Sequence, residues 1–305
     1  MPLPRLISIG ELFDRTWEHY HKHFFIYTGI SSTFLISTFV ALVALSFWPG
    51  IETLSTLNTG ATSLSGLEIT AILLYVANLL LAPILSLWIL ASIARATKDP
   101  ERMASSPVPI LKEGARLILP TFVVSALIAL ILIGLNLAAL VPGSLMYLFT
   151  LVWDAGVISF LGAALLTIGV LFGFVASAYV SVKLVFAPYL PALTGERGIS
   201  AIKASKSLTD GRFWGVLIRI IAPKIIFLVL GIFVLYVLNY FAGLFITSVG
   251  GLNINIATRL SLIINQVLPS LILIFINPLI VIADILLLQN ILSKKSPTMR
   301  PSSKF

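Results

Sequence analysis

The chain has 305 residues, of which 58% are hydrophobic and only 10% are charged, and its net charge is +8. Soluble domains are roughly half apolar and about a quarter charged, so this composition excludes an ordinary water-soluble protein. The absence of cysteine excludes disulfides, thiolate nucleophiles and cysteine-bound metals. Membrane topology accounts for the excess of Lys and Arg, so we expect no nucleic-acid partner.

The chain opens with an amphipathic segment at 8–24. Ser8 and Glu11 have the spacing of a capping box, which satisfies free amides at the start of a helix. Apolar and aromatic side chains recur on one helical face and charged side chains on the other, which predicts an interfacial helix on the membrane. His21 lies about 200° around this helix from His19 and His23, so the three imidazoles cannot converge. We therefore expect no metal site and no cofactor.

Six apolar segments follow, each long enough to supply the ~20 residues that cross a bilayer. They are continuous and lack the alternation of a membrane β-barrel, which favours α-helices. The sequence therefore predicts an all-α polytopic bundle, with a six-helix transmembrane domain at 1–293 and a basic tail at 294–305. The predicted spans are 25–48, 69–94, 117–141, 157–190, 214–248 and 260–291.

Lys and Arg gather in alternate connectors, and the opposite connectors contain only Arg259. This positive-inside pattern predicts a bacterial or archaeal inner-membrane protein with both termini in the cytoplasm. Short segments with a helical pattern precede each helix pair, at 8–24, 106–116 and 198–212, and their starts recur at roughly 95 residues. The spacing suggests three repeated units of short helix plus hairpin. The alternative is that six-helix proteins ordinarily place short basic helices on this side.

The charged side chains of Lys183 and Asp284 fall inside the spans at a similar shallow depth. Because a charge in hydrocarbon costs at least ~2.5 kcal/mol, we hypothesise that they pair; the alternative for Lys183 is snorkelling to the headgroups. Asn277 directly precedes Pro278, which lacks an amide hydrogen, so the last span has either a plain kink or a broken helix of the kind that forms transporter sites. Lys183, Asp284 and Asn277 are thus the candidate ion-pair or ligand site.

The segment at 198–212 has a second amphipathic pattern. One helical face has Ala201, Ala204, Ser205 and Leu208, whereas the other has Lys203, Lys206 and Asp210. We predict a surface helix docked on the bundle, in which Lys206 can pair with Asp210 in the weaker order. The alternative is that its lysines face anionic headgroups.

Common catalytic and nucleotide-binding motifs are absent, and all three histidines lie in the first segment, so we expect no enzymatic activity. Two segments, ISIGELFDRTWEHYHKHFFIYTGI and KLVFAPYLPALTGERGISAIKASKSLTDGRFWGVLIR, resemble the membrane domain of some bacterial glycerophosphoryl diester phosphodiesterases and their stand-alone relatives. By this resemblance the motif positions are Lys183, Pro188, Glu196, Gly198, Ala201, Ser205, Leu208, Gly211, Phe213 and Trp214.

The chain lacks the catalytic barrel of the fused enzymes, so the resemblance implies a membrane domain and no hydrolase activity. We expect a membrane-embedded accessory or scaffold whose partners are the lipid bilayer, including anionic headgroups, and an unidentified membrane protein. The alternative is a small transporter or lipid-handling protein for an anionic solute or headgroup. A polar cavity that links Lys183, Asp284 and Asn277 would favour this alternative.

Overall fold

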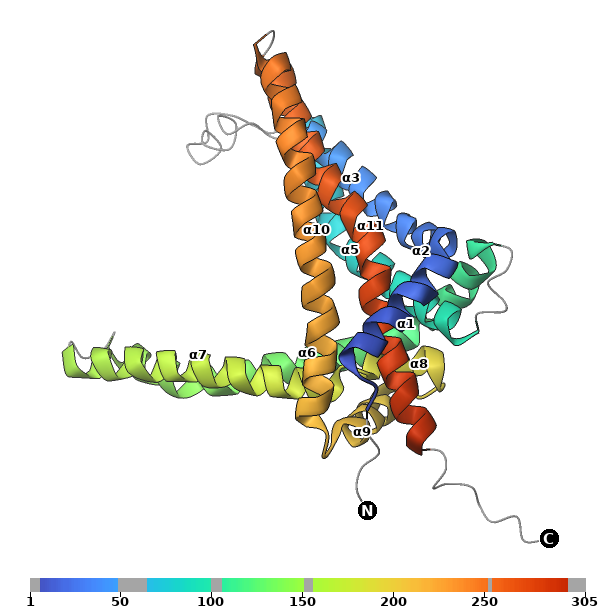
Figure 1. The fold of residues 1–305 in the computed structure, drawn as a ribbon. Helices are drawn as coiled ribbons and strands as arrows, with labels where there is room; N and C mark the ends of the chain where they lie inside the picture. Colours follow the sequence, from blue (N-terminus) through green and yellow to red (C-terminus); the bar gives the residue numbers. More distant parts are fainter. Residues whose placement is uncertain (1–5, 49–64, 100–105, 151–155, 252–253, 296–305) are drawn as a thin grey trace. The chain divides into compact units, whose positions relative to one another are not determined.

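The computed structural model describes residues 6–48, 65–99, 106–150, 156–251 and 254–295 (Figure 1). Every regular element among these residues is a helix, and six helical segments are long and apolar enough to cross a membrane. The all-α polytopic bundle predicted from the sequence is therefore confirmed.

The helices and 3-10 turns have the following bounds in chain order: α1 Ile9–Lys22, α2 Phe24–Ser31, η1 Ser32–Phe34, α3 Leu35–Ser46, α5 Gly66–Lys98, α6 Pro107–Phe149, α7 Gly156–Leu184, η3 Ala187–Tyr189, α8 Leu190–Leu193, α9 Gly198–Thr209, α10 Phe213–Gly250 and α11 Ile254–Lys295.

Several helices differ from the predicted spans. The expected short helix at 106–116 is not separate, because α6 runs without interruption from Pro107 to Phe149. Its polar residues, such as Lys112 and Glu113, are good helix formers and do not stop it. The first and third short helices are separate elements, α1 and α9, so a separate short helix precedes two of the helix pairs among the described residues and not all three. The predicted tail lies outside the described residues from 296 onward.

The chain divides into two compact units. The larger unit comprises residues 7–118 and 220–287, and therefore contains α1, α2, α3, α5 and most of α10 and α11. The smaller unit comprises residues 1–6, 119–219 and 288–305, and contains most of α6 together with α7, α8 and α9.

In the larger unit, α11 supplies much of the core between Ile274 and Leu287. An added Cβ at Gly231 of α10 would lie 3.2 Å from Ile276, which shows how closely these two helices approach. Aromatic pairs join other elements: the rings of Phe24 and Phe275 stack at 6.0 Å, linking α2 to α11. These contacts make α11 the helix around which α2 and α10 pack.

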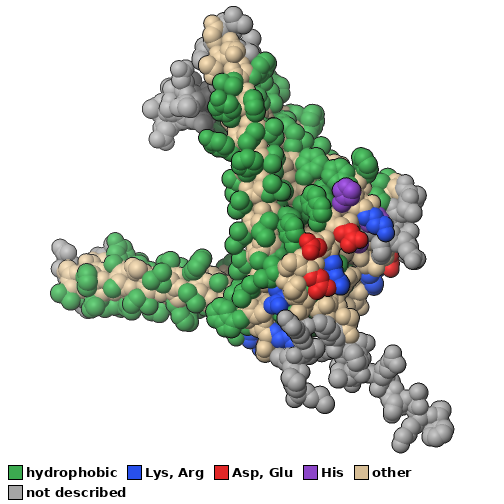
Figure 2. All heavy atoms as spheres, in the orientation of Figure 1, with side chains coloured by type: hydrophobic (Ala, Val, Ile, Leu, Met, Phe, Trp, Pro, Cys, Tyr) green, Lys and Arg blue, Asp and Glu red, His purple; other side chains and the backbone are tan. Residues whose placement is uncertain are grey.

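Charged side chains in the larger unit gather on α1. Ser8 accepts a hydrogen bond from the Glu11 amide at 3.1 Å, and the Glu11 carboxylate pairs with Arg15 at 2.6 Å. Only one of the two bonds of the predicted capping box is therefore present, because the Glu11 carboxylate pairs with Arg15. Figure 2 shows charged side chains over α1, whereas the visible face of α10 is mostly hydrophobic. Such an apolar outer face suits the hydrocarbon of a bilayer.

In the smaller unit, α6 and α7 form a tightly packed hairpin. A Cβ added at Gly143 would lie 2.5 Å from the Leu166 amide nitrogen, and one at Gly173 would lie 2.8 Å from the side chain of Asn136. Glycine lets the two helix backbones approach, as is usual where membrane helices pack. The amide of Asn136 also donates to the Ser177 hydroxyl at 2.7 Å, which ties the helices together.

Candidate functional site

The charged group that is most deeply buried in the larger unit is Asp284 on α11. Its side chain is 3% exposed and pairs at 2.9 Å with the ammonium of Lys224 on α10. Lys224 directly follows Pro223 inside an apolar stretch of the helix. The position of a charged pair within apolar surroundings is stable only because each charge offsets the desolvation of the other.

The predicted Lys183–Asp284 pair is wrong in this structure, because each residue has a different partner. The ammonium of Lys183 lies 3.0 Å from the carboxylate of Asp210 and 4.8 Å from the ring centre of Tyr179. The physical reason is the docking of α9: its C-terminal end brings Asp210 directly to the end of α7, where Lys183 lies.

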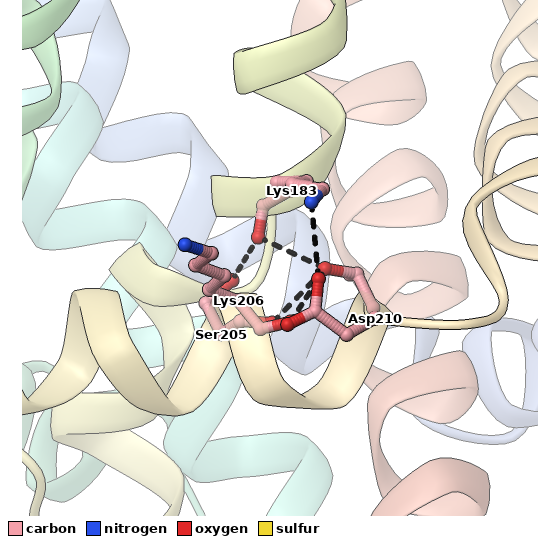
Figure 3. Close-up of polar contacts among 5 residues, drawn as sticks. Lys183, Ser205, Lys206 and Asp210 are labelled. Carbon is pink, nitrogen blue, oxygen red and sulfur yellow. Dashed lines mark hydrogen bonds and ion pairs between the residues drawn. The ribbon is translucent and has the colours of Figure 1, made fainter.

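The end of α7 is completed by side chains of α9 (Figure 3). The hydroxyls of Ser205 and Thr209 donate to the backbone carbonyl of Lys183 at 2.9 and 3.3 Å. A carbonyl at a helix end has no partner within its own helix, so these bonds act as a C-terminal cap. In Figure 3 the amine of Lys206 points away from Asp210, so the predicted Lys206–Asp210 pair is replaced by Lys183–Asp210.

The remaining motif positions shape the chain around α9. Of the predicted docking face, Ala201, Ser205 and Leu208 are buried and Ala204 is half-buried. Gly198 and Gly211 have φ of 54° and 73°, a left-handed conformation that glycine adopts without strain. Pro188 belongs to η3, Glu196 is exposed in the turn before α9, the Phe213 ring lies 4.9 Å from that of Tyr179, and Trp214 is 71% exposed.

Asn277 lies in a different environment from the two charged residues. It lines a cavity of about 230 Å³ in the larger unit, together with Ser31 and Ser86. Neither Asp284 nor Lys183 lines this cavity. α11 stays helical through Pro278, so Asn277 lies at a proline within a continuous helix and not at an unwound break.

A series of side-chain hydrogen bonds that the sequence did not predict links α1, α2 and α5 in the larger unit. Thr97 donates to the Ile93 carbonyl at 2.9 Å, so its oxygen is left to accept from the Tyr27 hydroxyl at 3.1 Å. Tyr27 in turn accepts from Nε2 of His19 at 2.7 Å. Tyr27 is fully buried and Thr97 is nearly so. His19 is therefore the outermost donor in this series of hydrogen bonds.

The ionisation of His19 is strongly affected by this position. Burial, followed by the nearby His23 and Lys22, lowers the pKa of His19 to about 4. Burial, followed by Lys22, also lowers the pKa of His23, whose ring lies 5.5 Å from that of His19. His19 and His23 share a side of the N-terminal segment, as the sequence predicted.

We expect the larger unit to lose stability between pH 7 and pH 5. The pKa of His19 is lower in the folded state than its ordinary value of 6.5, so the unfolded state binds the proton more readily. The stabilisation is complete above about pH 6.5 and is lost as the pH falls towards 4. With allowance for partial solvent access, the loss by pH 5 is about 1 to 2 kcal/mol. Thermal unfolding in detergent at both pH values measures it.

His19→Gln keeps a donor for Tyr27 but cannot titrate, and should remove most of this drop. The matched control is His21→Gln, because His21 is exposed; this variant should keep the wild-type response. An equal response in both variants would show that His19 is not the group responsible.

Among the described residues, no group of three His, Asp or Glu side chains is placed to hold a metal ion. No protein-family model, curated protein or solved structure matches the chain. The function must therefore be inferred from the geometry of the two units.

Proposed function

We propose that this chain is a non-enzymatic inner-membrane protein that acts as a membrane-embedded accessory or scaffold. The observation that carries the proposal is the use of the polar side chains within the spans. Four of these side chains, Asn78, Asn136, Lys183 and Asp284, bind a neighbouring helix of the same unit. A transport path would need such groups to line a shared cavity.

Four contacts illustrate this use of polar side chains. In the larger unit, Ser37 of α3 donates to Asn78 of α5 at 2.8 Å, and Lys224 pairs with Asp284. In the smaller unit, Asn136 binds Ser177, and Lys183 pairs with Asp210. Hydrogen bonds between membrane helices contribute about 0.6 kcal/mol on average, so each contact is a modest tie between two helices. Together these four contacts hold neighbouring helices in fixed positions within each unit.

The distribution of Lys and Arg supports cytoplasmic termini, with α1 and α9 as interfacial helices on that side. A cavity of about 300 Å³ beside α1 is lined by Arg15, Lys22, His19 and His23 with one carboxylate, Glu18. The two cations among them, Arg15 and Lys22, suit anionic lipid headgroups as a partner. The resemblance to stand-alone relatives of the phosphodiesterase membrane domain agrees with such a role.

The test is to purify the protein within its native lipid in polymer-bounded discs and to identify the retained molecules by mass spectrometry. We expect a membrane protein retained in stoichiometric amount with the wild type. Lys183→Leu should retain it too, because the ammonium of Lys183 is used internally by Asp210. The matched control is Lys206→Leu, which removes a neighbouring amine that points away from Asp210.

Two results would contradict the scaffold. One is an anionic solute or lipid that is retained by the wild type and Lys206→Leu but lost from Lys183→Leu, which would favour the transporter or lipid-handling alternative. The other is the absence of any stoichiometric partner together with solute uptake by reconstituted vesicles.

A further inference from the structure

The larger unit contains a cavity whose polar groups are not used by the contacts described above. It has a volume of about 230 Å³ and is bordered by the α2–η1 region, α5 and α11. All three segments belong to candidate membrane spans. Its volume corresponds to about eight molecules of liquid water, which is enough for a small organic molecule or for part of a lipid.

Ser31 provides the first indication that this cavity has an occupant. It is 2% exposed, and its hydroxyl has no hydrogen-bond partner among the described residues. A serine in a helix usually bonds to a carbonyl one turn earlier, as neighbouring Ser32 does with Gly29 at 2.8 Å. Because an unsatisfied buried hydroxyl is destabilising, a molecule that supplies a partner for Ser31 would be favoured at this position.

Asn277 and Pro278 provide the second indication, from α11. The Asn277 amide makes no hydrogen bond to any described side chain, unlike Asn78 and Asn136, which both bind neighbouring helices. Pro278 has no amide hydrogen to donate to the carbonyl of Ile274, which also lines the cavity. The residues that line the cavity therefore include Ser31, Asn277 and Ile274, whose carbonyl lacks its usual helical donor.

The lining also limits the charge of the occupant. Besides Ser31, Ser86 and Asn277, the lining is apolar and includes Phe34 and Ile89. No Lys, Arg, Asp or Glu lines it, so an ion would be desolvated without compensation. Neutral hydrogen-bonding groups in an apolar pocket are suited to a neutral amphiphile that carries an oxygen on an alkyl chain.

We propose that this cavity is a binding site for a neutral alkyl molecule with a hydroxyl or ester oxygen. Ser31 and the Asn277 amide bind the oxygen, and Phe34, Ile89 and Ile274 contact the chain. This chemistry occurs both in free alcohols and in the ester region of neutral lipids. The site does not depend on the scaffold function, because a bound molecule of this kind can be a permanent part of the larger unit.

The test uses full-length protein in lipid discs and two probes, a medium-chain alkanol that carries a diazirine and the matching alkane without the hydroxyl. After photolysis, we expect the alkanol to label cavity residues of α5 and α11, with competition by unlabelled octanol and with much weaker labelling by the alkane. Asn277→Leu should weaken alkanol binding about tenfold, which corresponds to the loss of one good hydrogen bond. Asn239→Leu, in α10 and outside the cavity, should leave binding unchanged.

Ser31→Ala provides a second variant that removes the hydroxyl with minimal change of volume, and it decides the test if Asn277→Leu does not fold. Mass spectrometry of the native-lipid preparation separates the two sources: a retained neutral lipid displaced by octanol indicates a lipid, whereas octanol binding without such a lipid indicates a free alcohol. Equal labelling by both probes, no labelling of the cavity, or binding unaffected by Asn277→Leu or Ser31→Ala would overturn the proposal and leave water as the occupant.

Discussion

Replacing Lys224 with methionine is expected to destabilise the larger unit by about 3 to 5 kcal/mol. The carboxylate of Asp284 is 3% exposed and lies 2.9 Å from the ammonium that this change removes. Without it, Asp284 must either remain ionised in apolar surroundings or take up a proton, and both alternatives cost free energy. The free energy of unfolding, measured by denaturant titration in mixed micelles, reports the loss.

The double variant Lys224→Met with Asp284→Leu should recover most of this stability, because apolar side chains can replace a buried pair at little cost. The matched control is Lys183→Met. The side chain of Asp210 is 50% exposed, so breaking that pair should leave the free energy of unfolding nearly unchanged. A double-mutant cycle that couples Asp284 to Lys183 and not to Lys224 would contradict the structure and restore the pair expected from the sequence.

The difference between these two ion pairs shows why the sequence predicted the wrong partners. Depth in the bilayer can be estimated from the distance along a helix to its polar end, and this estimate placed Lys183 and Asp284 at similar heights. It contains no information about which helices are neighbours. The apolar residues on both sides of Lys224 place it inside the predicted span 214–248, but they do not show that it faces Asp284.

Membrane class was predictable because it depends on composition averaged over about twenty residues. The ends of the helices were less predictable, because each end depends on its own capping residues. Ser65 and the Glu68 side chain form a capping box that starts α5 at Gly66, before the predicted start at 69. The contact between His19 and Tyr27 was missed for a related reason, because the chain leaves regular α-helix at His23 and the periodicity of one helix does not continue into the next.

The docking of α9 was partly predictable. Its buried face could be identified from the spacing of Ala201, Ser205 and Leu208. Its target could not, because the carbonyl of Lys183 that Ser205 and Thr209 bind is a backbone group present at every residue. Only the end of α7 at Leu184 makes that particular carbonyl available.

Replacing Gly143 with alanine is expected to destabilise the α6–α7 hairpin of the smaller unit by about 1 to 3 kcal/mol. The added Cβ would lie 2.5 Å from the backbone nitrogen and 2.8 Å from the Cα of Leu166. Backbone atoms cannot move aside as a flexible side chain can, so α7 would have to shift away from α6. The bond between Asn136 and Ser177 should weaken as the helices separate.

Gly134 on the same helix provides the matched control, because an added Cβ there meets nothing within 4 Å. Gly134→Ala should be neutral or stabilise by up to about 1 kcal/mol, since alanine favours a helix more than glycine does. The natural chain has no cysteine, so Asn136→Cys with Ser177→Cys gives a clean cross-linking background. Gly143→Ala should slow disulfide formation and Gly134→Ala should not. Equal rates in the two variants would show that close backbone approach at Gly143 does not hold the hairpin together.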